Sequence, residues 1–319
     1  MVFKWYRLSQ DYCKNLIISM LQTEQIHNKA KGLDKLAGEE ILSILLDSQI
    51  EAAKCVSSAI EPIERGARAM AKTLVNNKKI VYAAAGSSGL QAMADGLEIT
   101  PTFGIPISQI KILRAGGLED MSRPKGEMED SEEAAKKDGK IIETGDCVIC
   151  LAASGNTKYP AAIMRMSKEI GATTIGLANN PNTKLLNQAD IPILLPTAPE
   201  VIAGSTRLGA GTAQKIALNM MSSCMGVYLG NVMDGMMVNL IANNSKLLKR
   251  SEEIVMNITG CNRNQAARSL KQSKGAVKLA ILLVEGAKTI NEAKHVLDKE
   301  MQNLRAAISA LKAKKFNQC

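Results

Sequence analysis

Short apolar runs alternate with helix-like segments through the middle of the chain. Five runs rich in Ile, Val, Leu and Ala each lead into Gly, Ser, Asn or Thr, as buried parallel strands do where they give way to a helix. They are IVYAAAG, QIKILRAGG, DCVICLAAS, ATTIGLANN and DIPILLPT, which start at residues 80, 109, 146, 172 and 190. Segments with an apolar residue every three or four positions lie before and between them. This order predicts an α/β fold: a three-layer α/β/α sandwich around a five-stranded, mainly parallel sheet.

The pattern after Ser205 is helical throughout. We expect one long helix to about Leu229, a second over Val232 to Arg250, and short helices from Asn262 onward, where Asn262 and Asn264 each offer an N-cap. Three regions are therefore predicted: an N-terminal extension and helical arm at 1–39, a sheet domain at 40–254 and a helical C-terminal subdomain at 255–319.

Composition fits a large aliphatic core, because the 319 residues are 46% hydrophobic but only 3% aromatic. The formal charge is +9, from 40 basic and 31 acidic residues. The basic residues are scattered and lack the interleaved aromatics of a single-strand platform, so we expect no nucleic acid partner. A positive surface also suits an anionic small substrate. No apolar run reaches the roughly 18 residues of a membrane span, so no membrane association is expected.

The seven cysteines are odd in number, and the N-terminus MVFKWYRLSQ has no apolar signal region. They are expected to be reduced thiols, which predicts a cytoplasmic protein. Cys147 and Cys150 form a CxxC spacing that could be half of a metal site. However, alternation would place them on opposite faces of a buried strand, and there is no second CxxC. We therefore expect buried strand cysteines and no metal.

Two loops have the residue types that hold phosphate. GSSG at 86–89 and SGNT at 154–157 each follow a predicted strand, so backbone N–H groups, a helix dipole and hydroxyls converge there. Neither loop matches a dinucleotide or P-loop motif. A third segment, PEVIAGSTRLGAGTAQK, places an arginine in the first turn of a helix, where either a bound anion or a carboxylate partner would compensate its charge. The candidate binding residues are Ser87, Ser88, Ser154, Asn156, Thr157, Ser205 and Arg207.

Longer motifs resemble one family. The stretches AAGSSG, LEITPTFG, AASGNTKYP and PEVIAGSTRLGAGTAQKIALNM are similar to those of the N-acetylmuramic acid 6-phosphate etherases, which have the sugar-isomerase (SIS) fold, over residues 23–310. The resemblance implies a lyase that needs no cofactor and cleaves the lactyl ether of N-acetylmuramic acid 6-phosphate, giving N-acetylglucosamine 6-phosphate and D-lactate. It also implies a homodimer with the site near the subunit interface.

The same resemblance implies two catalytic glutamates. Glu98 in LEITPTFG matches the family acid, and a gap-free count from Gly116-Gly117 places the base at Glu129, with Glu127 as its rival. Proton abstraction at C2 of the open-chain sugar needs a base, and expulsion of lactate from C3 needs an acid. By composition alone, the segment 118–133, which holds seven acidic residues, is typical of a solvated loop.

The chain departs from the family at several substrate loops. Leu90 stands where the family has Arg, Asn156 and Lys158 stand in place of the Arg and Pro of Arg-Thr-Pro, and Asn239 replaces an Asp. Leu and Asn cannot replace the bidentate fork of an arginine. Two alternatives to the etherase therefore stay open: a non-catalytic sugar-phosphate-binding regulator and an aldose–ketose phosphosugar isomerase.

Overall fold

The computed structural model describes residues 21–118, 126–240 and 245–316. They form two compact units, each assembled from segments far apart in the sequence. The first contains residues up to 66, 80–94 and 112–220, and the second contains 67–79, 95–111 and 221 onward. The boundaries predicted after residues 39 and 254 stay predictions, and most of the expected N-terminal extension lies outside the described residues.

A five-stranded sheet forms the core of the first unit, as predicted. Its strand order is β2-β1-β3-β4-β5, and β1, β3, β4 and β5 pair in parallel. Every residue of β1 and β3 is buried, which explains why these strands are continuous apolar runs rather than alternating ones. The strands are β1 (Ile80–Ala84), β2 (Ile110–Arg114), β3 (Cys147–Ala152), β4 (Thr173–Ala178) and β5 (Ile191–Leu194).

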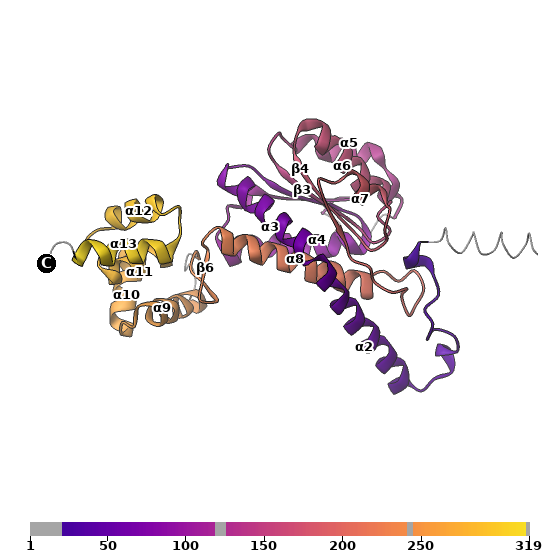
Figure 1. Ribbon diagram of the computed structural model, residues 1–319, viewed down its shortest axis with the longest axis horizontal. Helices are drawn as coiled ribbons and strands as arrows, with labels where there is room; N and C mark the ends of the chain where they lie inside the picture. Colours follow the sequence, from indigo (N-terminus) through magenta and orange to yellow (C-terminus); the bar gives the residue numbers. More distant parts are fainter. Residues whose placement is uncertain (1–20, 119–125, 241–244, 317–319) are drawn as a thin grey trace, which may run out of the picture. The chain divides into compact units, whose positions relative to one another are not determined.

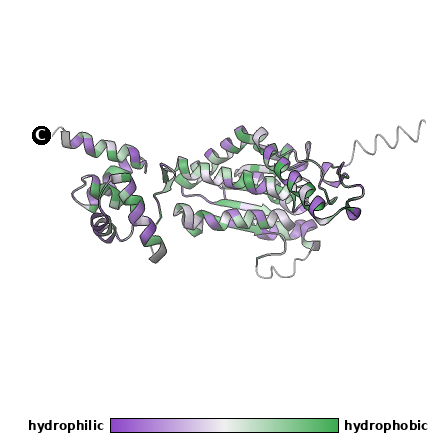
Figure 2. Cartoon of the chain, turned by 90° about the horizontal axis from the view of Figure 1, so that it is seen from below, coloured by the Kyte–Doolittle hydropathy of each residue, from purple (hydrophilic) through white to green (hydrophobic). Residues whose placement is uncertain are grey.

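Helices cover both faces of the sheet, so the three-layer prediction is confirmed. Figure 1 shows α5, α6 and α7 over one face and α3, α4 and α8 along the other, and Figure 2 shows hydrophobic strands between the helix layers. Tyr159, Ile163 and Met164 of α6 pack against Val148 in one buried cluster. The helices are α2 (Gly38–Cys55), α3 (Ile60–Val75), α4 (Gly86–Phe103), α5 (Glu132–Asp138), α6 (Lys158–Ile170), α7 (Lys184–Gln188) and α8 (Gly209–Tyr228).

The predicted helix over Val232 to Arg250 is wrong at its start. A short antiparallel hairpin occupies this place, with β6 (Val232–Met233) paired to β7 (Met236–Met237). Asp234 and Gly235 between them have φ angles of 49° and 75°. An Asp-Gly pair with positive φ at both positions is the preferred two-residue hairpin turn. The turn chemistry of Asp-Gly thus overrides the helical spacing of the apolar residues around it.

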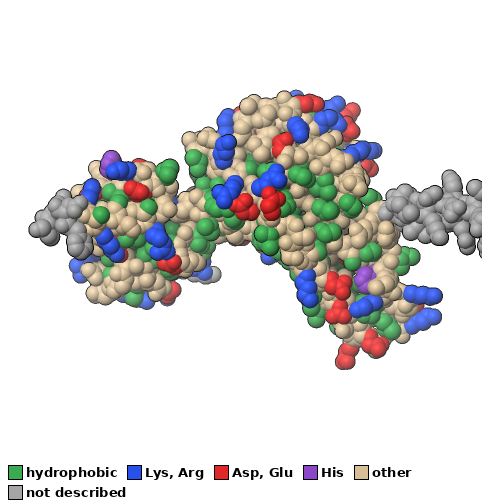
Figure 3. Space-filling view, in the orientation of Figure 1, with side chains coloured by type: hydrophobic (Ala, Val, Ile, Leu, Met, Phe, Trp, Pro, Cys, Tyr) green, Lys and Arg blue, Asp and Glu red, His purple; other side chains and the backbone are tan. Residues whose placement is uncertain are grey.

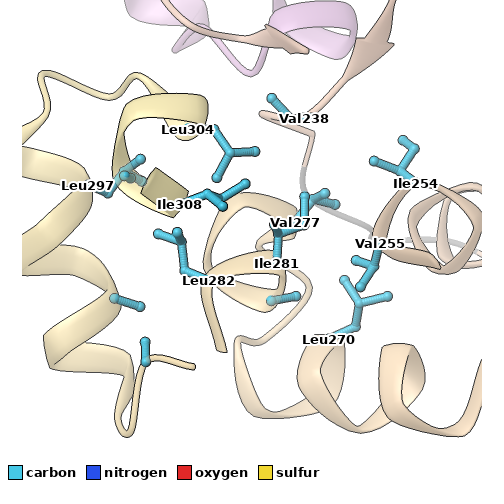
Figure 4. Close-up of a cluster of buried hydrophobic side chains, with 14 of the residues drawn as sticks. Val238, Ile254, Val255, Leu270, Val277, Ile281, Leu282, Leu297, Leu304 and Ile308 are labelled. Atoms are coloured by element: carbon cyan, nitrogen blue, oxygen red, sulfur yellow. The ribbon is translucent and has the colours of Figure 1, made fainter. Parts of the chain in front are cut away.

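Five helices complete the second unit and confirm the predicted helical C-terminal region. Asn262 accepts a hydrogen bond from the Gln265 backbone at 3.0 Å, so of the two candidate N-caps, Asn262 and Asn264, it is the one that caps α10. Figure 4 shows the core of these helices, where Val255, Ile281 and Leu282 are fully buried. The helices are α9 (Ser245–Thr259), α10 (Arg263–Gln272), α11 (Val277–Glu285), α12 (Ile290–Lys299) and α13 (Leu304–Phe316).

A buried lysine connects α11 to the end of α4 within this unit. The Lys278 ammonium donates to the Asn231 side chain at 3.0 Å and to the Gln302 carbonyl at 3.1 Å. Asn231 in turn donates to the Phe103 carbonyl at 3.1 Å, and Asn239 donates to the same oxygen at 2.9 Å. Burial lowers the pKa of Lys278 to about 8. The two neutral oxygens therefore accept the hydrogen bonds that the buried ammonium can no longer donate to water.

The packing of the second unit generates a stability prediction. Ile281→Ala should lower the free energy of unfolding by about 2–5 kcal/mol, because it opens a cavity among side chains that cannot fully collapse into it. The matched control is Leu248→Ala on α9, whose residue is 45% exposed and whose loss should stay within about 0.5 kcal/mol. Urea unfolding monitored by circular dichroism measures both. Equal losses in the two variants would contradict the assignment of this core.

Candidate active site

A cavity of about 250 Å³ opens at the carboxyl ends of β1 and β3 in the first unit. Ligands of open parallel sheets bind at these ends, so the location agrees with the fold. The side chains around it are mostly hydroxyls and carboxylates. Its lining includes Thr23, Glu24, Gly86, Ser87, Ser88, Glu129, Ser154, Thr157, Gly204 and Thr206. The structure thus brings together Ser87, Ser88, Ser154, Thr157 and Glu129 from the residues singled out in the sequence.

The GSSG segment forms the first turn of α4 directly after β1. Gly86 has a φ of 51°, a conformation that side chains disfavour. A Cβ placed on Gly86 would lie 2.8 Å from Oε1 of Glu129. The glycine therefore lets the carboxyl approach the backbone at the positive end of an 18-residue helix.

Glu129 is the perturbed carboxyl of this cavity. It lies half-buried on the short 3-10 turn Gly126–Asp130, and burial raises its pKa above the usual value. The neighbouring Asp130 adds to the rise, while the Arg114 guanidinium opposes it. Lys158 ion-pairs with Asp130 at 3.8 Å. A glutamate with a raised pKa in a polar cavity is suited to take up and return a proton.

The SGNT loop is held by its own side chains. Ser154 and Thr157 hydroxyls lie 3.2 Å apart, and Ser154 also accepts from the Asn156 backbone at 3.2 Å. Asn156 accepts from the Lys184 backbone at 3.1 Å, so it joins this loop to the start of α7 rather than lining the cavity. Gly155, with a φ of 70°, lies so close to Thr183 that a Cβ would overlap it.

Two polar residues of the cavity come from a part of the chain in which the sequence predicted no site. Thr23 and Glu24 belong to the 3-10 turn Gln22–Glu24, far from the other loops along the chain. Asn180, after β4, holds this turn: it accepts from the Thr23 backbone at 3.3 Å and donates to its hydroxyl at 3.2 Å. No local motif marks such a contact across 157 residues. The resemblance reached residue 23 but assigned no role there.

The N-terminus of α8 carries a further carboxylate that the sequence analysis missed. Glu200 is 2% exposed, and its two oxygens accept from the backbones of Gly209 and Ala210, both at 2.9 Å. It thereby satisfies two N–H groups that begin a helix. Arg207, just before this helix, is exposed and has no acidic partner within the described ranges. Ser205 precedes it and is partly buried; neither side chain belongs to the described lining of the cavity.

Glu98 lies on the C-terminal part of α4, in the second unit, and is exposed. The cavity with Glu129 is built from the first unit alone. The structure therefore defines the surroundings of Glu129 and leaves the pairing of the two glutamates as a hypothesis. Glu127, the rival of Glu129, is exposed on the same 3-10 turn and does not belong to the described lining.

Cys147 and Cys150 are fully buried free thiols in β3, as predicted, and burial raises the pKa of Cys147 to about 12. No group of three or more His, Cys, Asp or Glu residues suited to a metal occurs in the described part of the chain. Across these same residues, none of the helices combines the length and apolarity of a membrane span. In Figure 3, basic and acidic side chains lie in small scattered groups over the visible face of each unit.

Comparison with known proteins connects this site to one family. A model of the SIS domain matches residues 118–223. The N-acetylmuramic acid 6-phosphate etherase of Deinococcus radiodurans is 39% identical over 266 residues, 83% of this chain and 87% of that one. Those of Geobacillus sp. (strain WCH70) and Clostridium botulinum (strain Loch Maree) are 36% and 34% identical, over 92% and 93% of this chain and 100% and 99% of their own lengths. The chain therefore belongs to the N-acetylmuramic acid 6-phosphate etherase family.

Proposed function

We propose that the protein cleaves the lactyl ether of N-acetylmuramic acid 6-phosphate, giving N-acetylglucosamine 6-phosphate and D-lactate. The observation that carries this is a cavity at two strand ends in which hydroxyls surround a glutamate of raised pKa, in a chain similar to etherases over most of its length. Residues 40–254 are proposed as the phosphosugar-binding domain. The free thiols of the described residues fit a reducing compartment such as the cytoplasm.

The proposed reaction needs one base and one acid. Glu129 removes the proton at C2 of the open-chain sugar, and the electron pair forms a C2–C3 double bond. The C3–O bond breaks, and Glu98 gives its proton to the departing lactate oxygen. Water then adds at C3 while the proton returns to C2, with the two roles reversed. General acid–base transfer by positioned carboxyls supplies such steps without a cofactor.

The phosphate is proposed to lie on the two strand-end loops. Ser87, Ser88, Ser154 and Thr157 offer hydroxyl donors beside the backbone N–H groups that begin α4 and α6. This type of site binds a phosphate through dipoles rather than cationic side chains. Asn156 joins its loop to α7 from outside the lining. Ser205 and Arg207 flank the cavity residue Thr206, and the exposed Arg207 guanidinium, which has no acidic partner among the described residues, can add a positive field there.

Ser154→Ala should weaken the binding of N-acetylglucosamine 6-phosphate by about 1–3 kcal/mol, the cost of losing a hydrogen bond to a charged group. Isothermal titration calorimetry measures the change. Ser57→Ala is the matched control. This serine is exposed, and its hydroxyl donates to the Lys54 carbonyl within a local turn. Equal affinity of the wild type for the phosphorylated and unphosphorylated sugars would contradict a phosphate site.

Glu98→Gln and Glu129→Gln should separate the two half-reactions. Without the acid, Glu129 can still exchange the C2 hydrogen with solvent deuterium, although lactate release should fall about 10²–10⁴-fold. Without the base, exchange and lactate release should fall together by a similar factor. Proton NMR and a lactate assay read the two steps.

Glu127→Gln is the control for that experiment, since Glu127 is exposed on the same turn. It should leave both steps unchanged. If Glu127→Gln abolishes exchange while Glu129→Gln does not, the assignment of the base is wrong. If the wild type releases no lactate, the enzyme proposal itself fails and a sugar-phosphate-binding regulator takes its place.

We also propose a homodimer, with α2 as part of the interface. Leu42, Leu46 and Ile50 recur every four residues along α2 and are 66%, 61% and 44% exposed in the single chain. Such a stripe on one helix face usually packs against another element. Light scattering at micromolar concentration should give the mass of two chains, and Leu46→Lys should shift it toward one. Glu51→Lys, on a different face of α2, should leave the mass unchanged. A wild-type monomer with full activity would contradict a shared site.

A further inference from the structure

Two glycines of the GSSG turn make room for two charged side chains. A Cβ on Gly86 would meet the Glu129 carboxyl, and a Cβ on Gly89 would lie 3.1 Å from Cγ and 3.4 Å from Nε of Arg114. Gly86 and Gly89 both lie in the first turn of α4. Glu129 and Arg114 therefore both pack against the same end of this helix.

Arg114 is unusual for a charged residue in a strand. It ends β2, is only 5% exposed, and donates from Nη1 to the Gly117 carbonyl at 3.2 Å. Its buried Nε has no hydrogen-bond partner among the described residues. Burying a guanidinium with an unpaired N–H costs stability, and charged residues are rarely so buried without compensation. Leu90, which follows Gly89, is apolar and half-exposed, so Arg114 is the cationic side chain next to this turn.

We propose that Arg114 is a positioning residue of the active site: its guanidinium keeps Glu129 ionised and seated against α4, ready to accept the substrate proton. The hydrogen bond to Gly117 fixes the guanidinium against the turn that follows β2. This inference rests on the proposed role of Glu129 as the base. The role needs such a partner because burial alone favours the neutral acid, which cannot take a proton.

The other charges near Glu129 do not supply this effect. Asp130 is adjacent and acidic, and Lys158 is already paired with it at the surface. Glu24 lines the same cavity and Glu127 lies on the same turn; both add negative charge. Arg114 is thus the opposing charge that lowers the pKa of Glu129 against burial and Asp130.

The test is the pH dependence of lactate release. A base must be ionised, so activity falls as the pH drops through the pKa of Glu129. Arg114→Gln should move this low-pH limb of the profile upward by about one to two pH units, the effect of losing an opposite charge at this range, and leave the high-pH limb, which is set by the protonated acid, in place. At a pH below the limb, the rate should therefore fall about 10–100-fold. A purely structural role would lower the rate by the same factor at every pH.

Three further variants complete the test. Arg114→Lys keeps the charge and should keep the limb in place. Arg165→Gln removes an exposed arginine that pairs with Glu132 at 3.1 Å and should leave the profile unchanged. Gly89→Ala presses on the Arg114 side chain without a strained φ, so it should shift the limb upward by a smaller amount even if Arg114→Gln fails to fold.

A direct titration separates this proposal from the proposed function. Carbon-13 NMR of side-chain-labelled glutamate, with the Glu129 signal assigned through Glu129→Gln, follows the carboxyl without any substrate. The signal should titrate at a higher pH in Arg114→Gln or Gly89→Ala than in the wild type. If the wild type releases no lactate at any pH, the proposed reaction fails while this titration still decides the role of Arg114. An unmoved Glu129 titration in both variants overturns the inference.

Discussion

Parallel pairing of β1, β3 and β4 is the constraint on which the candidate site depends. The registers align Ala84 with Leu151 and Ala152 with Ala178, so these strands end at nearly the same level. Each strand then turns into a small polar loop at that edge, and loops separated by some 70 residues come to share one cavity. Because the strands are buried on both faces, a shift in register would disturb packing against both helix layers.

Much of this fold was readable from the sequence because its strands are buried. Continuous apolar runs closed by Gly or Ser give a stronger signal than alternating ones would when helices separate them. The strands starting near Ile80 and Cys147 and the cap at Asn262 were found this way. The hairpin at Asp234-Gly235 departs from the predicted helix because turn chemistry outweighs apolar spacing there, although the Asp-Gly pair is visible in the sequence. Contacts such as that between Thr23 and Asn180 could not be found, since nothing local encodes which distant partner a turn will meet.

The site shows the same division between local and non-local information. Ser87 and Ser154 were found because hydroxyls next to glycine after a strand have a direct physical meaning. Glu129 was identified by its spacing from a family motif, since its acidic surroundings resemble an ordinary solvated loop. Arg114 gave no functional signal in the sequence, because it lies in an apolar run that predicts a buried strand and a single arginine there only breaks the apolar pattern. Only the packing of its side chain on Gly89 reveals what it lies beside.

The polar chain from Lys278 through Asn231 to Phe103 has a consequence for how the protein can be shortened. The last carbonyl of α4 receives two amide donors, and one of these is itself held by the ammonium of α11. Removal of the C-terminal helices would leave Asn231 without that donor and uncover Val238 and Leu240, which are buried in the same hydrophobic cluster as Ile281. The end of the helix that carries Glu98 would then be held by two amide donors, one of which has lost its own ammonium partner. The C-terminal helices therefore cannot be removed without changing the packing and hydrogen bonding of the residues that remain. A chain trimmed to the sheet region would not keep the structure that this region has in the whole protein.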